Sequence, residues 1–178
     1  MAIYKLIDND NSILRVSLSE VSEDCDREKL QEDLIETMKN FKGLGLSANQ
    51  CGIMERVFVM YSDFEKREAT ACFNPKILDY SKEKVIMDEG CLSYPGLWLK
   101  VKRAHNILVE FEDVAGKKIE IPLQDLAARV FQHEMDHMEG TDFTKKVSKL
   151  RLDMAKKRML KQRKKANRIN DLRDSNVA

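Results

Sequence analysis

The chain contains the stretch Gln132-His133-Glu134-Met135-Asp136-His137, in which two of its three histidines lie four residues apart. On a helix, four residues turn through about 400°, so both imidazoles return to one face, about one turn apart. Such a pair can hold one metal ion, and Glu134 projects from a neighbouring direction towards water on that ion. The stretch predicts a helix that carries a metal-dependent hydrolytic site. The alternative is a charged helix with a chance histidine pair.

Short β-rich runs and a second helix surround this stretch. Apolar residues at helical spacing from Leu30 to Phe41 predict a helix over 26–41, ended by Gly43. Asp125 is expected to be the N-cap of the histidine helix. Ala115-Gly116 lies between the last two β-rich runs and predicts a hairpin, so antiparallel pairing is favoured. The β-rich runs are 56–61, 70–78, 84–87, 97–101, 107–111 and 117–122.

The length of 178 residues fits one domain with a core of its own. Four cysteines without CxxC spacing favour reduced thiols in the cytoplasm. The first residues have neither the apolar core of a signal peptide nor the composition of a transit peptide, and no run approaches the length of a membrane span. We therefore expect a cytoplasmic protein without membrane contact. The cysteines are Cys25, Cys51, Cys72 and Cys91.

The charge is divided unevenly along the chain. Residues 145–178 hold 13 Lys and Arg against 3 Asp and Glu, and the remainder holds 18 basic against 27 acidic side chains. From 145 to about 170 there is no Gly or Pro, and only a thin apolar stripe that includes Leu152, Ala155 and Met159. This segment predicts a protruding or loosely docked basic helix that meets a polyanion. We expect residues 1–148 to form the catalytic domain and residues 149–178 a helical extension of it.

The histidine pair needs a third protein ligand. Glu139 is the last Glu of the chain, so the downstream Glu of thermolysin-type peptidases is absent, and Phe143 stands where the metzincin pattern has its last His. His105 precedes a strand and is better explained as an ordinary surface or half-buried histidine. Cys91, in Glu89-Gly90-Cys91-Leu92-Ser93, is another candidate, although a lone cysteine is more often a small buried apolar residue.

Three motifs occur in order along the chain, and together they resemble those of the peptide deformylase family. They are Gly43-Leu44-Gly45-Leu46-Ser47-Ala48-Asn49-Gln50, Glu89-Gly90-Cys91-Leu92-Ser93 and Gln132-His133-Glu134-Met135-Asp136-His137. The resemblance spans most of residues 1–150 and implies removal of the N-formyl group from the formylmethionine of nascent polypeptides, releasing formate. The implied fold is α+β, with antiparallel sheets packed around a central helix that carries the HExxH motif, plus the C-terminal basic helix.

The resemblance also implies a metal site and catalytic residues. Cys91, His133 and His137 would bind one divalent ion, Fe²⁺ as the native one, with Zn²⁺, Ni²⁺ or Co²⁺ as alternatives for the same donors. Glu134 would take a proton from water and pass it to the leaving amine. The side-chain amide of Gln50 and the backbone N–H of Leu92 would stabilise the oxyanion.

The same resemblance implies a pocket for the methionine side chain. Its apolar wall would come from Leu44, Leu126 and Val130, and Gly45 would contact the peptide backbone. Arg129 stands where an apolar residue is expected, so it either points out of the pocket or narrows it. Ser47 and Asn49 replace the commoner Ala and Thr, with little effect expected. Glu89 and Gly90 complete the expected substrate-binding residues.

The expected partners are N-formylmethionyl nascent peptides and the ribosome near its exit tunnel, which the basic helix would contact, and we expect a monomer. Two other functions remain open at this point. One is a different amidohydrolase or peptidase that uses the same ion. The other is a catalytically idle ribosome- or RNA-binding module, which the retention of Glu134 and a complete ligand set disfavours.

Overall fold

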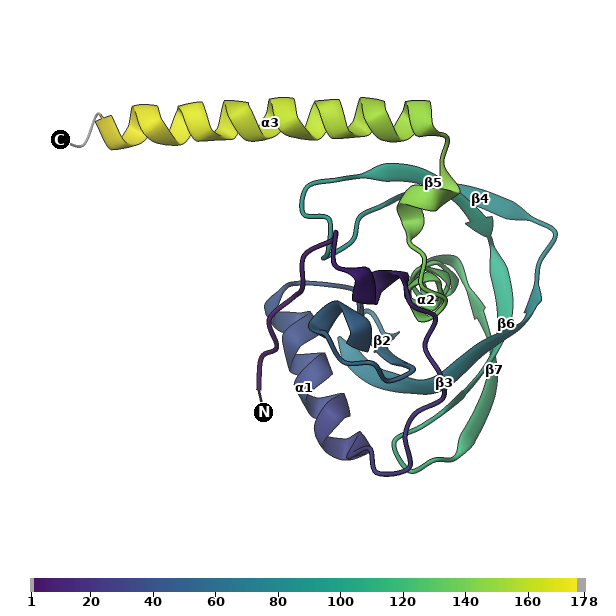
Figure 1. The fold of residues 1–178 in the computed structure, drawn as a ribbon. Helices are drawn as coiled ribbons and strands as arrows, with labels where there is room; N and C mark the ends of the chain where they lie inside the picture. The colour runs from purple at the N-terminus through teal and green to yellow at the C-terminus, as the bar shows by residue number, and fades with distance from the viewer. Residues whose placement is uncertain (1, 176–178) are drawn as a thin grey trace.

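The computed structural model describes residues 2–175, with side chains through Arg168. Within these residues, two antiparallel sheets and two α-helices form one α+β unit, and a third, long helix extends from it (Figure 1). The predicted fold class is confirmed. The elements are η1 (Ser12–Arg15), α1 (Arg27–Asn40), β1 (Gly45–Ser47), η2 (Ala48–Cys51), β2 (Val57–Asp63), β3 (Glu68–Tyr80), β4 (Lys84–Glu89), β5 (Leu99–Ala104), β6 (Asn106–Glu112), β7 (Lys118–Gln124), α2 (Asp125–Met138), η3 (Phe143–Lys146) and α3 (Lys149–Ser175).

The larger sheet has the strand order β1-β2-β3-β6-β7, and β4 and β5 form a separate two-stranded sheet. All neighbouring strands are antiparallel. The predicted hairpin joins β6 and β7, where Gly116 has a φ of 79°, a left-handed value that glycine adopts without steric cost. Strand β1 lies outside the β-rich runs predicted from the sequence. It consists of three residues of the first motif and pairs Gly45 with Met60.

Strand β2 contributes side chains to two hydrophobic clusters, one on each face of the larger sheet. Its Phe58 and Met60 face a cluster that includes Phe131 and Met138 of α2. Its Val57 and Val59 face the opposite cluster, which α1 covers through residues such as Leu34. Successive side chains of a strand point to opposite faces, so a nearly continuous apolar run is the pattern of a strand buried on both sides.

Helix α2 lies at the centre of the molecule, seen nearly end-on between the two sheets in Figure 1. Eleven of its fourteen residues are buried. The prediction that Asp125 caps this helix is wrong. Asp125 is its first residue, with a φ of 53°, and Gln124, the last residue of β7, is the N-cap without a side-chain capping bond. The strand runs directly into the helix because Gln124 still pairs with Asn106, so no loop residue is available as a cap.

Helix α3 leaves the body after η3 and projects beyond it (Figure 1). The thin apolar stripe predicted from the sequence holds the first turns of α3 against the body. Its Leu152, Ala155 and Met159 pack against a cluster that contains Leu99 and Phe143. Its lysines and arginines from 156 to 168 are exposed. Residues 176–178 of the expected extension lie outside the described residues. Within residues 2–175, no helix combines the length and hydrophobicity that a membrane crossing requires.

Candidate metal centre

Two elements bring three metal-ligating side chains together. Cys91 lies in the loop after β4, and His133 and His137 lie one turn apart on α2. Their ligand atoms are all within 4.8 Å of one another, and Cys91 Sγ is 3.4 Å from His137 Nε2. In the part of the chain that the structure describes, no other group of His, Cys, Asp and Glu has this geometry.

The orientation of His133 fits a metal ligand. Its Nδ1 lies 3.1 Å from Oε2 of Glu89, so a proton on Nδ1 is held there and Nε2 remains the donor atom. One thiol and two imidazoles are donors that suit borderline-soft divalent ions such as Zn²⁺ and Fe²⁺. The donor set and its spacing therefore fit a single divalent ion.

The pKa values of the two buried histidines shift in opposite directions. For His137, burial lowers the pKa to about 3, so its imidazole is neutral at pH 7. For His133, burial also disfavours the charged form, but hydrogen bonds with Cys91 and Glu89 outweigh it and raise the pKa to about 10. A cation bound between Cys91 and His133 would take the place of the proton between them, so binding is expected to release a proton.

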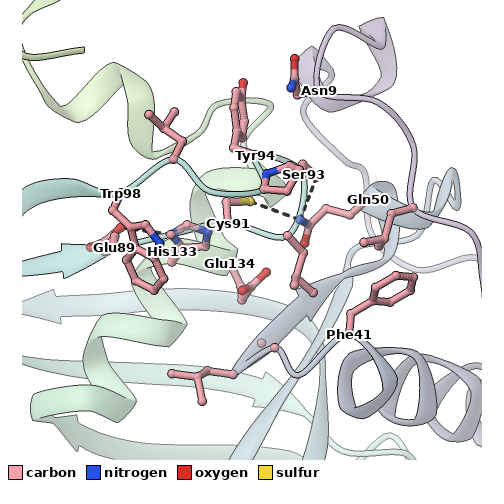
Figure 2. Close-up of a pocket in the computed structure, with 18 of the residues that line it drawn as sticks. Asn9, Phe41, Gln50, Glu89, Cys91, Ser93, Tyr94, Trp98, His133 and Glu134 are labelled. Carbon is pink, nitrogen blue, oxygen red and sulfur yellow. Dashed lines mark hydrogen bonds and ion pairs between the residues drawn. The ribbon is translucent and has the colours of Figure 1, made fainter. Parts of the chain in front are cut away.

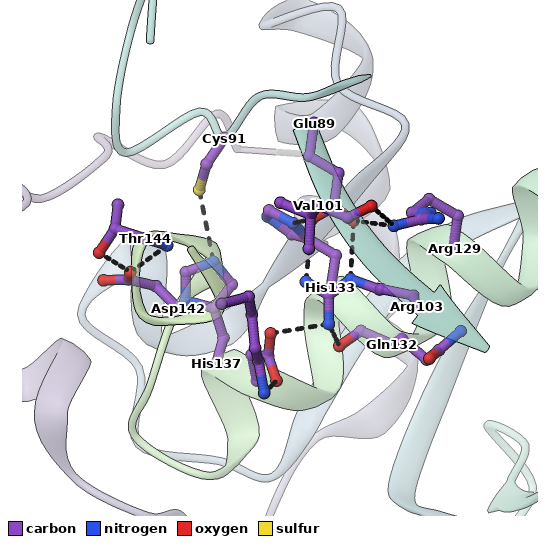
Figure 3. A network of polar contacts seen from close by, with 12 residues as sticks. Glu89, Cys91, Val101, Arg103, Arg129, Gln132, His133, His137, Asp142 and Thr144 are labelled. Atoms are coloured by element: carbon purple, nitrogen blue, oxygen red, sulfur yellow. Dashed lines mark hydrogen bonds and ion pairs between the residues drawn. The ribbon is translucent and has the colours of Figure 1, made fainter. Parts of the chain in front are cut away.

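A buried network holds Glu89 in place (Figure 3). Arg103 donates to both of its oxygens, with Nε at 2.7 Å from Oε1 and NH2 at 2.9 Å from Oε2. Arg129 donates from NH1 to Oε1 at 2.7 Å and from NH2 to the Val85 carbonyl at 2.8 Å. The Arg129 guanidinium is thus anchored on β4 and β5, while the residue also forms part of the wall of the cavity next to this network.

Glu134 is 3 % exposed, and its Oε2 accepts a hydrogen bond from the Ser47 hydroxyl at 2.5 Å. Burial raises the pKa of this carboxyl above its ordinary value. Ser47, for which little effect was expected, therefore contacts the expected catalytic carboxylate directly. Asn49 likewise has a specific partner, since its amide donates to the His137 carbonyl at 2.9 Å. The motif pattern shows that Ser47 and Asn49 differ from the commoner residues, and the fold shows which atoms the two side chains contact.

Gln50 is buried beside Cys91 (Figure 2). Its Oε1 accepts the Ser47 N–H at 3.0 Å, which fixes the amide so that Nε2 donates to Ser93 Oγ at 2.9 Å and lies 3.3 Å from Cys91 Sγ. Leu92, the other expected oxyanion donor, follows Cys91 in the same loop. The loop after β4 and the turn η2 after β1 therefore meet at Cys91.

A cavity of about 700 Å³ opens at this site, with Glu134, Cys91 and Gln50 in its wall (Figure 2). His137 is 1 % exposed and is not among the lining residues, whereas His105 lies elsewhere, with Nε2 3.5 Å from Asp125. Phe41 and Trp98, which are not among the residues predicted for the site, also form part of the wall. The remaining expected catalytic and substrate-binding residues all line the cavity: Leu44, Gly45, Glu89, Gly90, Leu92, Leu126, Arg129 and Val130.

Asp142, just beyond α2, ties the site to the start of the chain. Its carboxylate pairs with Arg15 of η1 and accepts hydrogen bonds from the Tyr94 hydroxyl at 2.7 Å and the Thr144 N–H at 2.9 Å. No short-range pattern joins residues so distant in sequence, so this cluster was not predicted. It fixes the loop that carries Cys91 against η3.

A Cys-His-His set with both histidines buried, beside a buried carboxylate at the wall of a cavity in an α+β fold, is the arrangement of a metal-dependent hydrolase. The polypeptide deformylase family model matches residues 3–153. A peptide deformylase from Rhizobium meliloti is 36 % identical over 167 residues, covering 92 % of this chain and 96 % of the relative.

Solved structures agree with this match. A peptide deformylase from Legionella pneumophila superposes with a TM-score of 0.82 at 34 % identity, covering 94 % of this chain and 99 % of that one. One from Plasmodium falciparum gives a TM-score of 0.80 at 32 % identity, covering 88 % and 94 %. The chain belongs to the polypeptide deformylase family, whose members are metal-dependent enzymes that remove the N-formyl group from nascent polypeptides.

Proposed function

We propose that the site described above releases formate from N-formylmethionyl peptides, with Cys91, His133 and His137 holding one divalent ion. The observation that carries this proposal is the convergence of the three donors with Glu134 and Gln50 at one cavity. A divalent ion held there supplies Lewis acidity and makes water nucleophilic at neutral pH. Fe²⁺ is the proposed native ion, and Zn²⁺, Ni²⁺ or Co²⁺ suit the same donors.

Glu134 acts as the general base. Its carboxylate accepts a proton from the attacking water and delivers it to the amine that leaves as the formamide bond breaks. The Ser47 hydroxyl holds Oε2, so Oε1 is the atom that remains to exchange the proton. Gln50 Nε2 and the Leu92 N–H donate to the oxygen of the formyl group, where negative charge develops.

The methionine side chain enters the part of the cavity walled by Leu44, Leu126 and Val130. Arg129 contributes its aliphatic stem to this wall, because its guanidinium is turned towards Glu89 and Val85. Gly45 allows close approach of the peptide, while Glu89 and Gly90 shape the wall between the metal ligands and Trp98. An unbranched thioether suits a mainly apolar cavity of this size.

The proposed partner of the tail is the ribosome near the exit tunnel, where formylated chains emerge. The exposed cations of α3 support it, since such a helix binds phosphate through counterion release. We further propose that residues 1–148 are the catalytic domain, that residues 149–178 are its helical extension, and that the protein acts in the cytoplasm as a monomer.

Formate release from a formyl-Met tripeptide, with metal analysis of the same anaerobic sample, tests the proposed site. We expect Cys91→Ala to lower both metal content and turnover. Cys25→Ala is the matched control and is expected to retain both, because Cys25 packs against the cluster that α1 covers and lines neither the cavity nor the ligand set. Stoichiometric tight metal in Cys91→Ala, with an unchanged spectrum of the Co²⁺-substituted form, would remove Cys91 from the site.

A further inference from the structure

A second cavity, of about 600 Å³, lies against another face of α2. Its α2 residues are Gln132, Met135 and Asp136, whereas the substrate cavity uses positions such as Val130 and Glu134. No residue lines both cavities. The second cavity is therefore separate from the deformylation site.

The acids of this cavity are already neutralised. Glu139 Oε1 lies 2.5 Å from Arg56 NH2, and Asp136 lies 2.9 Å from both Arg103 NH1 and Lys146 Nζ. The two carboxylates that line the cavity are thus both ion-paired, and they occupy three of its six cationic side chains. Any further lysine at the cavity contributes charge that the wall itself does not cancel.

Three exposed lysines supply that charge. Lys84 and Lys102 form no ion pair with any residue that the structure describes within 2–168, and Lys76 has only Glu20 at 3.8 Å, where both side chains are largely exposed. The register of β4 and β5 pairs Ile86 with Lys102 and Lys84 with Ala104, so the two lysines project from the same face as diagonal neighbours. Ammonium groups so placed, with little competition from local acids, suit successive phosphates.

An aromatic ring completes the arrangement. Tyr80, at the end of β3, lines the same cavity and is 56 % exposed. An exposed ring beside unpaired cations is the combination that binds single-stranded nucleic acid, because a base stacks on the ring while the lysines contact the backbone. A lipid headgroup or an acidic peptide would use the lysines but has no base to place on Tyr80.

We propose that this cavity binds single-stranded RNA, with phosphates on Lys76, Lys84 and Lys102 and a base on Tyr80. The site goes beyond the ribosome contact proposed for α3 and does not depend on it. Lys146 lines the cavity and α3 begins at Lys149, so a bound strand would continue from the cavity onto the basic helix. The full RNA surface would then combine a stacking site on the body with a purely electrostatic one on α3.

Fluorescence anisotropy of the full-length protein with a labelled single-stranded RNA, at several salt concentrations, tests this site. Lys84→Gln with Lys102→Gln should reduce the slope of log K against log salt by about 1.4, since each phosphate contact to a single strand contributes about 0.7. If the variant and the wild type have equal affinity at 1 M salt, this slope difference corresponds to a loss of about 25-fold in affinity at 0.1 M salt. Tyr80→Ala should weaken binding by about fivefold or more while leaving the salt slope unchanged.

The control is Lys117→Gln with Lys118→Gln, which removes the same charge from the exposed β6–β7 hairpin. Equal losses for the hairpin and cavity pairs would overturn the proposal, because only net charge would then matter. Wild-type affinity in Tyr80→Ala would overturn the assignment to single-stranded RNA, as would equal competition by inorganic phosphate at matched ionic strength. Deformylation of a formyl-Met tripeptide should be unchanged in all these variants, which separates failure of this site from failure of the catalytic one.

Discussion

Glu134 is the residue whose replacement separates metal binding from chemistry. Glu134→Gln keeps the size of the side chain and can still accept the Ser47 hydrogen bond, but the amide cannot take a proton from water. We expect metal content to be retained and turnover to fall by about 10²- to 10⁴-fold, the usual contribution of a positioned general base. Steady-state formate release at neutral pH, with metal analysis, measures both. Activity above about a tenth of wild type would show that another group moves the proton.

Gly45 controls where the Glu134 carboxylate can lie. A Cβ on Gly45 would be 2.5 Å from Glu134 Oε1 and 2.9 Å from Val130 Cγ1. Gly45→Ala must therefore displace the carboxylate from the ligand side of the cavity, and we expect kcat to fall at least about tenfold with metal content intact. Unchanged kcat with a raised KM would instead indicate that Gly45 serves only to admit the peptide.

At the scale of elements, Asp142 connects η1, the Cys91 loop and η3. Burial opposes ionisation of this carboxyl, but hydrogen bonds from Thr144, Tyr94 and Arg15 outweigh it and lower its pKa from 3.8 to about 2. A carboxyl with a folded pKa below its unfolded value stabilises the fold above the unfolded pKa. That contribution, about 2 kcal/mol here, is lost as pH falls from about 4 through the folded pKa.

Asp142→Asn tests this account through urea unfolding at several pH values. The asparagine variant should be less stable than wild type at pH 7, and the difference should shrink as the pH is lowered from 5 towards 3. Glu68→Gln, an exposed substitution at the start of β3, is a control expected to change little. A difference that stays constant down to pH 3 would assign the loss to packing rather than to the charge of Asp142.

At the scale of the whole molecule, an acidic body carries a basic helix. Deleting residues after Ser148 would expose the apolar cluster that Leu152, Ala155 and Met159 cover, so exposed charges are a cleaner target than the whole helix. Substituting four exposed lysines of α3 with Gln should weaken cosedimentation with ribosomes and make it less sensitive to salt, while deformylation of short peptides stays intact. The lysines are Lys157, Lys161, Lys164 and Lys165.

A control for this experiment replaces an equal number of lysines on the body. Lys39, Lys66, Lys117 and Lys118 are exposed and line neither cavity. Pelleting that is equal and insensitive to salt in wild type and both variants would exclude α3 as a ribosome anchor.

The sequence alone determined the α+β class, the antiparallel hairpin and the face that His133 and His137 share on α2, because these depend on helical periodicity and on turn residues close together in the chain. Cys91 could be predicted as the third metal ligand only from the three motifs together, because a single cysteine has no spacing pattern that distinguishes a ligand from a buried apolar residue. The tertiary structure decided what depends on atoms brought together from distant segments. Ser47 reaches Glu134 and Arg129 turns to Glu89 because β1 and β5 pack against α2. Asp142 joins Arg15 and Tyr94 because η1 and the Cys91 loop both meet the segment that follows α2. The N-cap of α2 was also decided by the tertiary structure. Gln124 is the N-cap in place of the expected Asp125, because β7 remains paired with β6 up to Gln124 and the helix starts at the next residue.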